Sequence, residues 1–523
     1  MYDKSDLKLF KRLGVKPDQV DGQLQRFRDG CGHVELHDAA APGNGIRTLA
    51  PDEADNYAAL HEARKATVPM TKMVPASGSA TRMFKTLNTF MTTYTASDEE
   101  YLRLRQEREP GTVSAFFDKI KEYPFFRQLR EVIYADHLDV DKLLHKNQFI
   151  EILEYLLTPK GLNYNATPKG LICFHLYQEH ARTAFEEHLV EGALYCHNGK
   201  TANLHFTVAA EHADKFKALL KSVRARYQRE TGIQFKVSFS VQRSDTDTVS
   251  VTPDGNLLRD ERGAIVFRPG GHGALIHNLN ELKEEVVFIK NIDNVTPDRN
   301  KAATVRYKRA LGGILLETRE RIFHHARLLE KREPSAAVLD EIEEFIRRHL
   351  GYRPGEEAAR AGKRERVKLL KQLLDRPLRV CGMVKNEGEP GGGPFWVGSP
   401  ADGYRLMIVE SAQVDLKNRA QRGIFERSTH FNPVDIVCST YNHKGKKYNL
   451  LDFVDDRQAF ITTKSFNGRE ILVQELPGLW NGAMANWNTI FVEVPLETFT
   501  PVKTVFDLLR VEHLNVFTPM EFQ

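Results

Sequence analysis

The chain has 523 residues, of which 41% are hydrophobic and 28% are charged, a composition typical of a water-soluble globular protein with two or three domains. The formal net charge is only +4, so the pI reflects near balance and nucleic acid is not expected as a partner. Five widely spaced cysteines, none of them in a CxxC pair, argue against a disulfide framework and against a structural zinc site.

The sequence shows no recognisable targeting or membrane segment. Its first ten residues are charged and lack the apolar run of a signal peptide. No stretch of about 18 apolar residues could form a transmembrane helix. We therefore expect a cytoplasmic protein without a membrane partner.

The N-terminal part of the chain is predicted to be mainly helical. Residues 1–65 are expected to form an N-terminal helical segment. An apolar strand at residues 68–74 leads into a loop of small residues, after which a helical pattern resumes at Thr81. This order of strand, tight loop and helix is typical of a phosphate-binding turn. Residues 86–157 then show apolar positions at three- and four-residue spacing, which predicts a helical insertion.

Helices and strands alternate after this insertion. The pattern predicts a helix at 175–190, a strand at 204–209, a helix at 211–228, and strands at 235–241 and 286–290. Such alternation indicates an α/β fold in which helices pack on a largely parallel sheet. We expect residues 66–300 to form this core, residues 301–377 a helical segment, and residues 378–523 a strand-rich C-terminal part.

The loop Pro75-Ala-Ser-Gly-Ser-Ala-Thr-Arg82 is the first candidate for ligand binding. Small side chains allow backbone N–H groups to approach an anion; they are Ala76, Ser77, Gly78, Ser79, Ala80 and Thr81. Arg82 would add a bidentate phosphate donor. The loop is not a Walker motif, since no Gly-Lys-Ser/Thr follows at the needed spacing. A tight turn with a solvent-facing arginine explains the pattern equally well.

Two lysines are candidates for phosphate contacts. Lys169 lies in a Thr-Pro-Lys-Gly sequence that opens a predicted helix, where a positive charge is unfavourable unless it meets an anion. Lys503 follows a strand-like run at residues 489–494. The alternative for each is an exposed lysine in a turn or on the surface.

A glycine-rich turn and a strand end complete the candidate set. Gly271, His272 and Gly273, preceded by another glycine, permit close packing of the backbone against a flat ligand such as a base or a sugar ring, although a ligand-free connection fits too. Asp293 follows the strand at 286–290, and ligands gather at the carboxyl ends of strands in open α/β sheets. Its carboxylate could hold Mg²⁺ shared with phosphates, or Asp293 could belong to an ordinary turn.

Taken in order, these segments resemble the UDP-sugar pyrophosphorylases, especially the branch of UDP-N-acetylhexosamine pyrophosphorylases and UTP–glucose-1-phosphate uridylyltransferases. That family has a GGGxGTR loop, a PKG, an FxQ strand, a GNGG or GHG turn, a strand ending in Asp-Asn, and an EVxRxxEFSPLKN segment. The counterparts here are residues 76–82, 168–170, 239–242, 270–273, 293–294 and 492–503. The whole chain most resembles a bacterial family of unassigned function that carries this divergent set.

The resemblance implies an α/β fold of the A-type nucleotide-diphospho-sugar transferases, which is Rossmann-like with a mixed sheet, helical insertions and a strand-rich C-terminal part on the sugar-phosphate side. It further implies a role for each matched residue. Arg82 and its loop would hold the triphosphate, and Lys169 would compensate phosphate charge. Lys503 would contact the sugar phosphate or the α-phosphate, and Asp293 would bind Mg²⁺. Gln242 and Gly271 would contact the base, and residues 271–273 would approach the sugar.

The implied activity is that of a nucleotidyltransferase that joins a sugar 1-phosphate to a nucleoside triphosphate, UTP in the family, and releases pyrophosphate. Ala76, Ser77 and Ala80 stand where the family prefers glycine, so a catalytically silent nucleotide-sugar-binding protein is one alternative. A glycosyltransferase of the same fold is another, because Asp245-Thr-Asp247 forms an Asp-x-Asp pattern after a predicted strand. Asp415 and Asp435 are the guesses for a second metal carboxylate.

Overall fold

The computed structural model describes residues 2–78, 80–95, 97–107, 109–178, 180–330, 334–389 and 391–515. The chain forms two compact units, each drawn from separate stretches of sequence. Unit 1 comprises Met1–Met73, Ser240–Ile289 and Arg306–Leu496, and unit 2 comprises Val74–Phe239, Lys290–Val305 and Glu497–Gln523. Each unit has its own buried apolar core.

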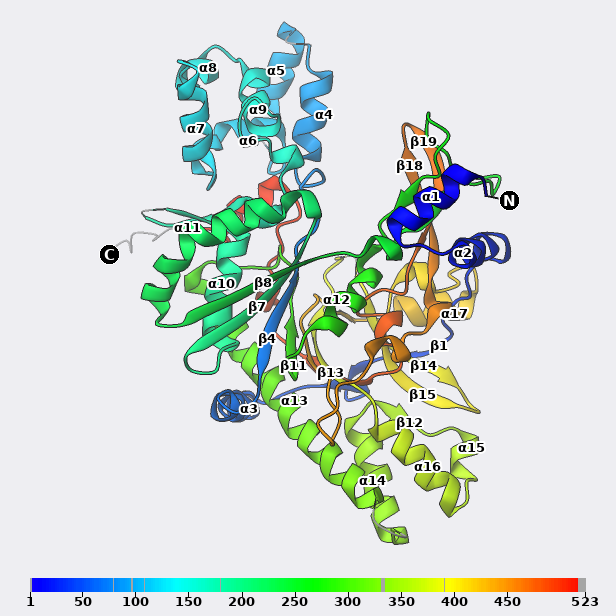
Figure 1. Ribbon diagram of the computed structural model, residues 1–523. Coiled ribbons are helices and arrows are strands. Elements are labelled where there is room, and N and C mark those ends of the chain that lie inside the picture. The colour runs from blue at the N-terminus through cyan, green and yellow to red at the C-terminus, as the bar shows by residue number, and fades with distance from the viewer. Residues whose placement is uncertain are drawn as a thin grey trace. The chain divides into compact units, whose positions relative to one another are not determined.

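Unit 2 is built around strands covered by helices (Figure 1). Its strands include the end of β4 (Met70–Pro75), β7 (Thr201–Val208) and β8 (Gln234–Val241), and β7 and β8 are neighbours. Strands β5 (Cys173–Leu176) and β6 (Ala181–Thr183) form a separate antiparallel pair. Helices α10 (Ala184–Tyr195) and α11 (Ala213–Thr231) lie beside these strands (Figure 1). Helix α10 is almost wholly buried, and a capping box between Thr183 and Glu186 fixes its first turn.

A group of helices gathers at one end of unit 2 (Figure 1). Its members are α4 (Lys85–Thr93), α5 (Asp98–Gln106), α6 (Val113–Asp118), α7 (Phe126–Ala135), α8 (Val140–His145) and α9 (Phe149–Leu157). Their apolar faces carry many aromatic side chains, and Phe116, Phe125 and Tyr155 are among the most deeply buried. The helical insertion predicted at residues 86–157 therefore has its own share of the unit 2 core.

The main sheet of unit 1 is mixed. Its strands follow the order β2 (Ala41–Pro42), β3 (Gly45–Arg47), β20 (Asn488–Glu493), β13 (Leu378–Lys385), β17 (Ile436–Ser439), β11 (Val286–Ile289) and β4. Strands β3, β20 and β13 are parallel, as are β11 and β4, whereas β17 is antiparallel to both of its neighbours and β16 (His430–Phe431) pairs with β13. All four residues of β11 are buried, as expected for a strand covered on both faces.

Two smaller sheets and several helices complete unit 1. One sheet has the order β1 (Leu36–Ala39), β14 (Gly393–Ser399), β15 (Gly403–Val409), β12 (Tyr352–Arg353), and the other β10 (Phe267–Arg268), β9 (Thr248–Val251), β19 (Arg469–Glu475), β18 (Phe460–Phe466). The helices are α1 (Lys4–Leu13), α2 (Pro17–Asp29), α3 (Pro51–Arg64), α12 (Leu275–Glu281), α14 (Ala336–His349), α15 (Glu356–Ala359), α16 (Lys363–Leu374), α17 (Arg419–Glu426) and most of α13 (Lys301–Glu330).

The expected α/β class with a mixed sheet is confirmed. Along the described strand order of the main sheet of unit 1, four of the six neighbouring pairs are parallel, and β17 supplies the two antiparallel ones. Two local predictions are wrong. Residues 175–190 form β5, β6 and the start of α10 instead of one helix. Residues 1–65 contain β1, β2 and β3 besides helices. Among the residues described, no helix combines the length and apolar character needed to cross a membrane.

Candidate functional site

Three residues that are far apart in the sequence meet in unit 2. The ammonium of Lys169 lies 2.9 Å from Asp293 Oδ2, and the ammonium of Lys503 lies 3.6 Å from the same oxygen. Lys169 Nζ also donates to the carbonyl of Val502 at 2.8 Å. The structure thus brings together three of the predicted site residues, with Lys169 and Lys503 beside the carboxylate of Asp293. We call these three residues the Asp293 cluster.

Backbone pairing places Lys503 beside Asp293. The segment after β11 forms an isolated antiparallel bridge between Asn294 and Pro501. Val502 N donates to the carbonyl of Asp293 at 3.0 Å, and Thr500 N donates to Asn294 Oδ1 at 3.0 Å. Asn294 is almost fully buried, so its side chain serves as an internal support for the C-terminal segment. The Asp-Asn sequence is therefore more than a solvent-exposed turn.

The Pro-Lys-Gly sequence approaches the cluster closely because it contains a glycine. A Cβ added to Gly170 would lie 2.8 Å from the Phe216 ring and 3.3 Å from Ile292, the residue before Asp293. Lys169 begins a single 3-10 turn, Lys169–Leu171, which is followed by β5. The predicted helix opening is wrong here, so no helix dipole acts on Lys169. The nearby charge of Asp293 accounts for its position instead.

The charges of the Asp293 cluster do not cancel. The side chains of Lys169 and Asp293 are 15% and 12% exposed, whereas that of Lys503 is 50% exposed. Although burial opposes ionisation, the positive charges of Lys169 and Lys503 lower the pKa of Asp293 below its ordinary value. Two ammonium groups face one carboxylate, which leaves one excess positive charge. Such a cluster attracts an anionic ligand, and half-exposed Lys503 is the cation most open to it.

The small-residue loop after β4 is tied to the same region. Ala80 N donates to the carbonyl of Thr167 at 3.2 Å, two residues before Lys169. Val505 N donates to the carbonyl of Met83 at 3.0 Å, two residues after Lys503. These bonds hold the backbone next to exposed Arg82 against both lysine-bearing segments. Arg82, Lys169 and Lys503 thus come from neighbouring segments of unit 2.

Part of the loop is occupied by protein contacts. Ala76 and Ala80 are buried, and Ala76 N donates to the carbonyl of Thr207 at 2.8 Å. Thr81 Oγ1 donates to the carbonyl of Asn165 at 3.1 Å. Partly exposed Ser77 and exposed Gly78 remain as positions where a ligand could approach the backbone, while Ser79 lies outside the described residues. Helix α4 begins only at Lys85, four residues later than predicted, because residues 81–84 form turns.

A cavity of about 380 Å³ adjoins this loop within unit 2. Its lining is polar and includes Thr81 and Lys85, together with Asn88 and Asn165. The two asparagine side chains hold each other through a pair of 2.8 Å hydrogen bonds. Lys85, close in sequence to Arg82, is the cation here that suits an anionic ligand, whereas the Asn88 amide already donates to Asn165 and to the carbonyl of Phe84.

The predicted base- and sugar-binding residues belong to unit 1. The Nε2 atom of Gln242 is buried and has no hydrogen-bond partner among the described residues. Asn278 holds the preceding strand end by donating to Ser240 Oγ at 2.7 Å and to the carbonyl of Val241 at 3.1 Å. A buried amide donor without a partner is costly, which makes Gln242 a candidate for contact with a ligand carbonyl.

The glycine-rich turn packs against the protein itself. Gly271 has φ +73°, and a Cβ there would lie 2.2 Å from Glu475 Oε2; a Cβ on Gly273 would lie 2.4 Å from the carbonyl oxygen of Pro477. His272 Nδ1 accepts from Leu479 N at 3.1 Å, and its ring stacks on Trp480 at 4.1 Å. Burial lowers the pKa of His272 despite the nearby charges of Glu410 and Glu475. Internal packing thus already explains these glycines.

Of the other carboxylates considered from the sequence, Asp245, Asp415 and Asp435 have protein partners. Asp245 lies in a 3-10 turn, and Arg243 Nε donates to it at 2.9 Å. Burial and the charge of Asp245 raise the pKa of Asp247 to about 6. Asp435 is buried in an ion pair with Lys308, and Asp415 accepts from Lys417 N at 3.0 Å. Within the described part of the chain, no group of three or more His, Cys, Asp or Glu side chains is arranged to hold a metal ion.

A buried network in unit 2 was not predicted from the sequence. His175 Nδ1 lies 2.9 Å from Glu187 Oε1, and His175 Nε2 lies 2.9 Å from Nδ1 of His513. Because Glu187 accepts from Nδ1, Nε2 is the acceptor for His513. Burial favours the neutral acid, but Lys301, His175 and Arg182 hold the pKa of Glu187 below its usual range. The network anchors the C-terminal segment that carries Lys503.

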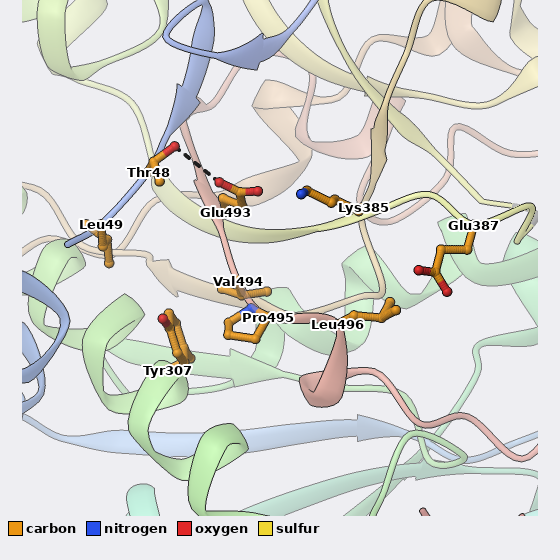
Figure 2. Close-up of a pocket in the computed structure, with 9 residues that line it drawn as sticks. All are labelled: Thr48, Leu49, Tyr307, Lys385, Glu387, Glu493, Val494, Pro495 and Leu496. Atoms are coloured by element: carbon orange, nitrogen blue, oxygen red, sulfur yellow. Dashed lines mark hydrogen bonds between the residues drawn. The ribbon is translucent and has the colours of Figure 1, made fainter. Parts of the chain in front are cut away.

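Sequence analysis also missed a cavity of about 300 Å³ in unit 1, where the carboxyl ends of parallel β3, β13 and β20 meet (Figure 2). Lys385, from the end of β13, points toward Glu493 (Figure 2). Thr48 Oγ1 donates to Glu493 Oε2 at 3.2 Å, and His430 Nε2 lies 3.4 Å from the other oxygen. Strand carboxyl ends are a common ligand position in α/β sheets, but strands this distant in sequence give no local signal.

Residues 3–514 match the family described as Domain of unknown function (DUF4301), and the chain belongs to this family. No curated protein matches the sequence.

Several solved structures are similar at low identity. The UDP-N-acetylglucosamine pyrophosphorylase of Trypanosoma brucei, in complex with an inhibitor, has a TM-score of 0.46 and 13% identity, over 94% of this chain and 74% of that one. The G45Y mutant of UDP-glucose pyrophosphorylase from Leishmania major, in complex with UDP-glucose, has a TM-score of 0.43 and 12% identity, over 97% and 77%. A putative UDP-N-acetylglucosamine pyrophosphorylase from Entamoeba histolytica has 0.41 and 10%, over 87% and 80%. These likenesses are distant.

Proposed function

We propose that this protein is a nucleotidyltransferase of the sugar-1-phosphate class, which joins a sugar 1-phosphate to UTP and releases pyrophosphate. The observation that carries the proposal is the Asp293 cluster, in which Lys169, Asp293 and Lys503 converge from positions more than 120 residues apart in the sequence. The order of the motifs in the sequence predicts this convergence. We further propose the A-type nucleotide-diphospho-sugar transferase fold for the chain.

The proposed chemistry depends on positioning and on charge neutralisation. In this reaction a phosphate oxygen of the sugar 1-phosphate attacks the α-phosphorus of UTP, and pyrophosphate leaves in line. No nucleophilic side chain is required. Lys503, half exposed, would contact the sugar phosphate or the α-phosphate, while Lys169 and Arg82 would neutralise charge on the triphosphate. Ser77 and Gly78 offer the loop positions nearest to open solvent.

Asp293 is the residue that would hold Mg²⁺. Magnesium bound with phosphates commonly takes only one or two protein carboxylates, and a single ionised carboxylate fits that pattern. The metal would supply charge stabilisation on the leaving pyrophosphate. Lys169 and Lys503 are paired with Asp293, and a metal ion on this carboxylate would free both ammonium groups to turn toward phosphate oxygens. The roles of Gln242 in base contact and of residues 271–273 near the sugar remain predictions for unit 1.

The test is pyrophosphate release by the purified full-length protein. With Mg²⁺ present, we expect release from UTP and at least one sugar 1-phosphate in a panel. Lys503→Ala should lower kcat/KM by about 100-fold or more, the scale seen when one charge-stabilising donor is lost. Lys221→Ala, an exposed lysine of α11 in the same unit, is the matched control and should leave the rate unchanged.

Two results would count against this proposal. Absence of pyrophosphate release across a broad panel of nucleoside triphosphates, from protein shown to be folded by circular dichroism, would reject the enzymatic activity. If calorimetry then showed UDP-sugar binding without turnover, the silent nucleotide-sugar-binding alternative would replace it. The two loop amides already bonded to protein carbonyls give that alternative its physical basis.

A further inference from the structure

Unit 1 contains a second cavity that the proposed reaction does not use. Its volume is about 680 Å³, within the range of about 300–1,000 Å³ usual for small-molecule sites. The turn between β2 and β3, the start of β20, the end of α14 and the start of β12 all contribute to its lining. We call it the Arg353 cavity, after its most informative residue.

Arg353 is held in place without a carboxylate partner among the described residues. Its guanidinium lies 3.8 Å from the ring centroid of Trp396, and its Nη2 atom donates to Asn44 Oδ1 at 2.6 Å. Trp396 Nε1 donates to the same oxygen at 3.1 Å. The Asn44 amide is itself oriented by a 3.0 Å bond from Nδ2 to Asp38 Oδ2. The arginine is therefore pre-oriented, and most of its five N–H donors are unused by these contacts.

The tight turn beside Asn44 explains how the indole and the amide can meet. Gly45 has φ +97°, and a Cβ there would lie 2.9 Å from Trp396 Nε1 and 2.8 Å from Leu406. Only glycine permits this left-handed conformation together with such close packing. Gly45 thus allows the Trp396 indole and the Asn44 amide to meet, and these are the two groups that hold Arg353.

The rest of the lining is positive on balance. Three more arginines border the cavity, Arg47, Arg347 and Arg348, against one carboxylate, Glu317. The last two arginines pair with Glu344 at the end of α14, where cations also suit the helix dipole. Arg47 is bonded to Tyr57 Oη at 3.0 Å and to Glu53 at 3.4 Å. These partners leave Arg353 as the principal donor for a ligand.

His349 lies at the cavity wall, where burial, reinforced by the charges of Arg321 and Arg47, lowers its pKa. Ile46, Ile314 and Phe491 supply apolar surface on other sides of the cavity. A ligand that matches this lining has an anionic group and a less polar body.

We infer that the Arg353 cavity binds a small organic phosphate, whose phosphoryl oxygens accept hydrogen bonds from the pre-oriented guanidinium. A planar guanidinium matches two phosphoryl oxygens at once, which favours phosphate over an uncharged sugar or nucleoside. All the residues that carry this inference belong to unit 1, whereas the Asp293 cluster belongs to unit 2. The inference therefore stands independently of the proposed reaction.

Calorimetric titration with UMP and with glucose 1-phosphate tests the inference. The titrations use full-length Lys169→Ala/Lys503→Ala protein, in which the Asp293 cluster has lost both ammonium groups. We expect one binding site for at least one of these phosphates, and no measurable binding of uridine or glucose. Adding Arg353→Ala should weaken binding at least tenfold, and Arg353→Lys, which keeps the charge but not the fork, should also weaken it. Arg360→Ala, an exposed arginine on the same unit, should not.

Three outcomes would overturn the inference. They are equal affinity with and without Arg353, equal affinity for uridine and UMP, and no binding of either phosphate by the folded protein at millimolar concentration. Pyrophosphate release is measured separately on wild-type protein. Failure of the proposed reaction with intact phosphate binding in the double-lysine variant, or the reverse, separates the two claims.

Discussion

At the scale of single residues, Asp293 illustrates how one side chain can be both a structural and a functional candidate. It forms ion pairs with two lysines from different segments, and its own carbonyl pairs with the backbone that carries one of them. Burial alone would raise its pKa, so its ionisation depends on those lysines. Removing the carboxylate would leave two neighbouring ammonium groups facing each other, which favours their separation.

Asp293→Ala should abolish Mg²⁺-dependent pyrophosphate release, whereas Asp245→Ala should reduce it much less. The reason is that Asp245 is neutralised by Arg243, while Asp293 lies between the lysines assigned to phosphate. The measurement is initial rate against Mg²⁺ concentration for both variants, with thermal melting as a check on folding. A larger loss from Asp245→Ala would contradict the assignment of the metal to Asp293. The Asp-x-Asp glycosyltransferase alternative instead predicts release of UDP from a UDP-sugar, which Asp245→Ala should abolish.

Gly170 and Gly78 provide a matched pair of glycine-to-alanine substitutions. Gly170→Ala would force a Cβ to within 2.8 Å of Phe216, and we expect it to lower the free energy of unfolding by about 1–3 kcal/mol. Gly78→Ala meets nothing within 4 Å, and the φ of Gly78 lies outside the left-handed region, so stability should stay within about 1 kcal/mol. Urea denaturation measures both.

The Gly78→Ala variant also tests the role of the loop after β4. If the backbone at Gly78 approaches phosphate, Gly78→Ala should weaken UTP binding although the protein remains as stable as wild type. Unchanged UTP affinity in this variant would show that the loop does not cradle the triphosphate at that position.

At the scale of elements, the segment after β20 is held to unit 2 by the buried His513–His175–Glu187 network. His513 stacks on His175 with ring centroids 5.2 Å apart. Burial, with the charges of His175 and Arg510, lowers the pKa of His513 to about 3. Burial also lowers the pKa of His175, although Glu187 opposes this shift. Both histidines are therefore neutral in the folded protein at pH 7. Protonation of His175 would place a positive charge near Lys301 and Arg182, and protonation of His513 would place one near Arg510.

The stability of wild-type protein should fall as pH drops below about 6.5, the ordinary value for histidine. Between that pH and about 3 the unfolded chain binds a proton that folded His513 does not, so acid favours unfolding. His513→Gln removes this titration but can still donate to His175. In urea denaturation from pH 7 to pH 5, the free energy of unfolding of His513→Gln should depend on pH less steeply than that of the wild-type protein. Each extra proton that the unfolded chain binds contributes a slope of about 1.4 kcal/mol per pH unit. Identical slopes for the two proteins would refute this account.

Sequence patterns predicted several elements of the α/β core correctly, and the failures have two different causes. Strands at 204–209, 235–241 and 286–290 correspond to β7, β8 and β11, each recognisable from its own residues. Strands β1 and β3 were missed because they are short and pair with β14 and β20, hundreds of residues away. The pattern at residues 175–190 predicts one helix, although Thr183 and Glu186, spaced as a capping box, mark the true start of α10.

The candidate site shows the same division between local and distant information. Lys169, Asp293 and Lys503 could be selected because each lies in a recognisable motif at a strand end or turn. His175, Glu187 and His513 could not, since nothing local to His513 indicates that it meets a histidine 338 positions earlier. Arg353 was missed for a similar reason, because its partners Trp396 and Asn44 lie on other elements.

At the scale of the whole molecule, each unit is discontinuous in sequence. Unit 2 takes three stretches of the chain, and the last contributes Val502, Val505 and Leu508 to its core. These side chains are at most 1% exposed. Deleting a large buried side chain typically costs about 2–5 kcal/mol, and total stability is only about 5–15 kcal/mol. Unit 2 therefore depends on its last stretch for stability.

Truncation after Leu496 should unfold unit 2 while the main sheet of unit 1 persists. The measurement is amide hydrogen exchange, with protection expected to disappear from β7, β8 and α10 and to remain in β13 and β20. Val511→Ser, a change at a residue 70% exposed in the removed segment, is the control and should keep full protection. Retained protection of β7 and β8 after truncation would contradict the importance of the last stretch.

The order in which unit 2 is encoded has a consequence for synthesis. Arg82 and Lys169 are synthesised early, whereas Lys503 and His513 are added only after more than 300 residues beyond Lys169. During that interval the apolar side chains that pack against Val502 and Leu508 in the folded unit are uncovered. The nascent chain then contains Arg82 and Lys169 but not yet Lys503. Chaperone engagement should therefore be strongest while unit 1 is being translated, and a premature stop codon anywhere before position 503 should yield inactive protein.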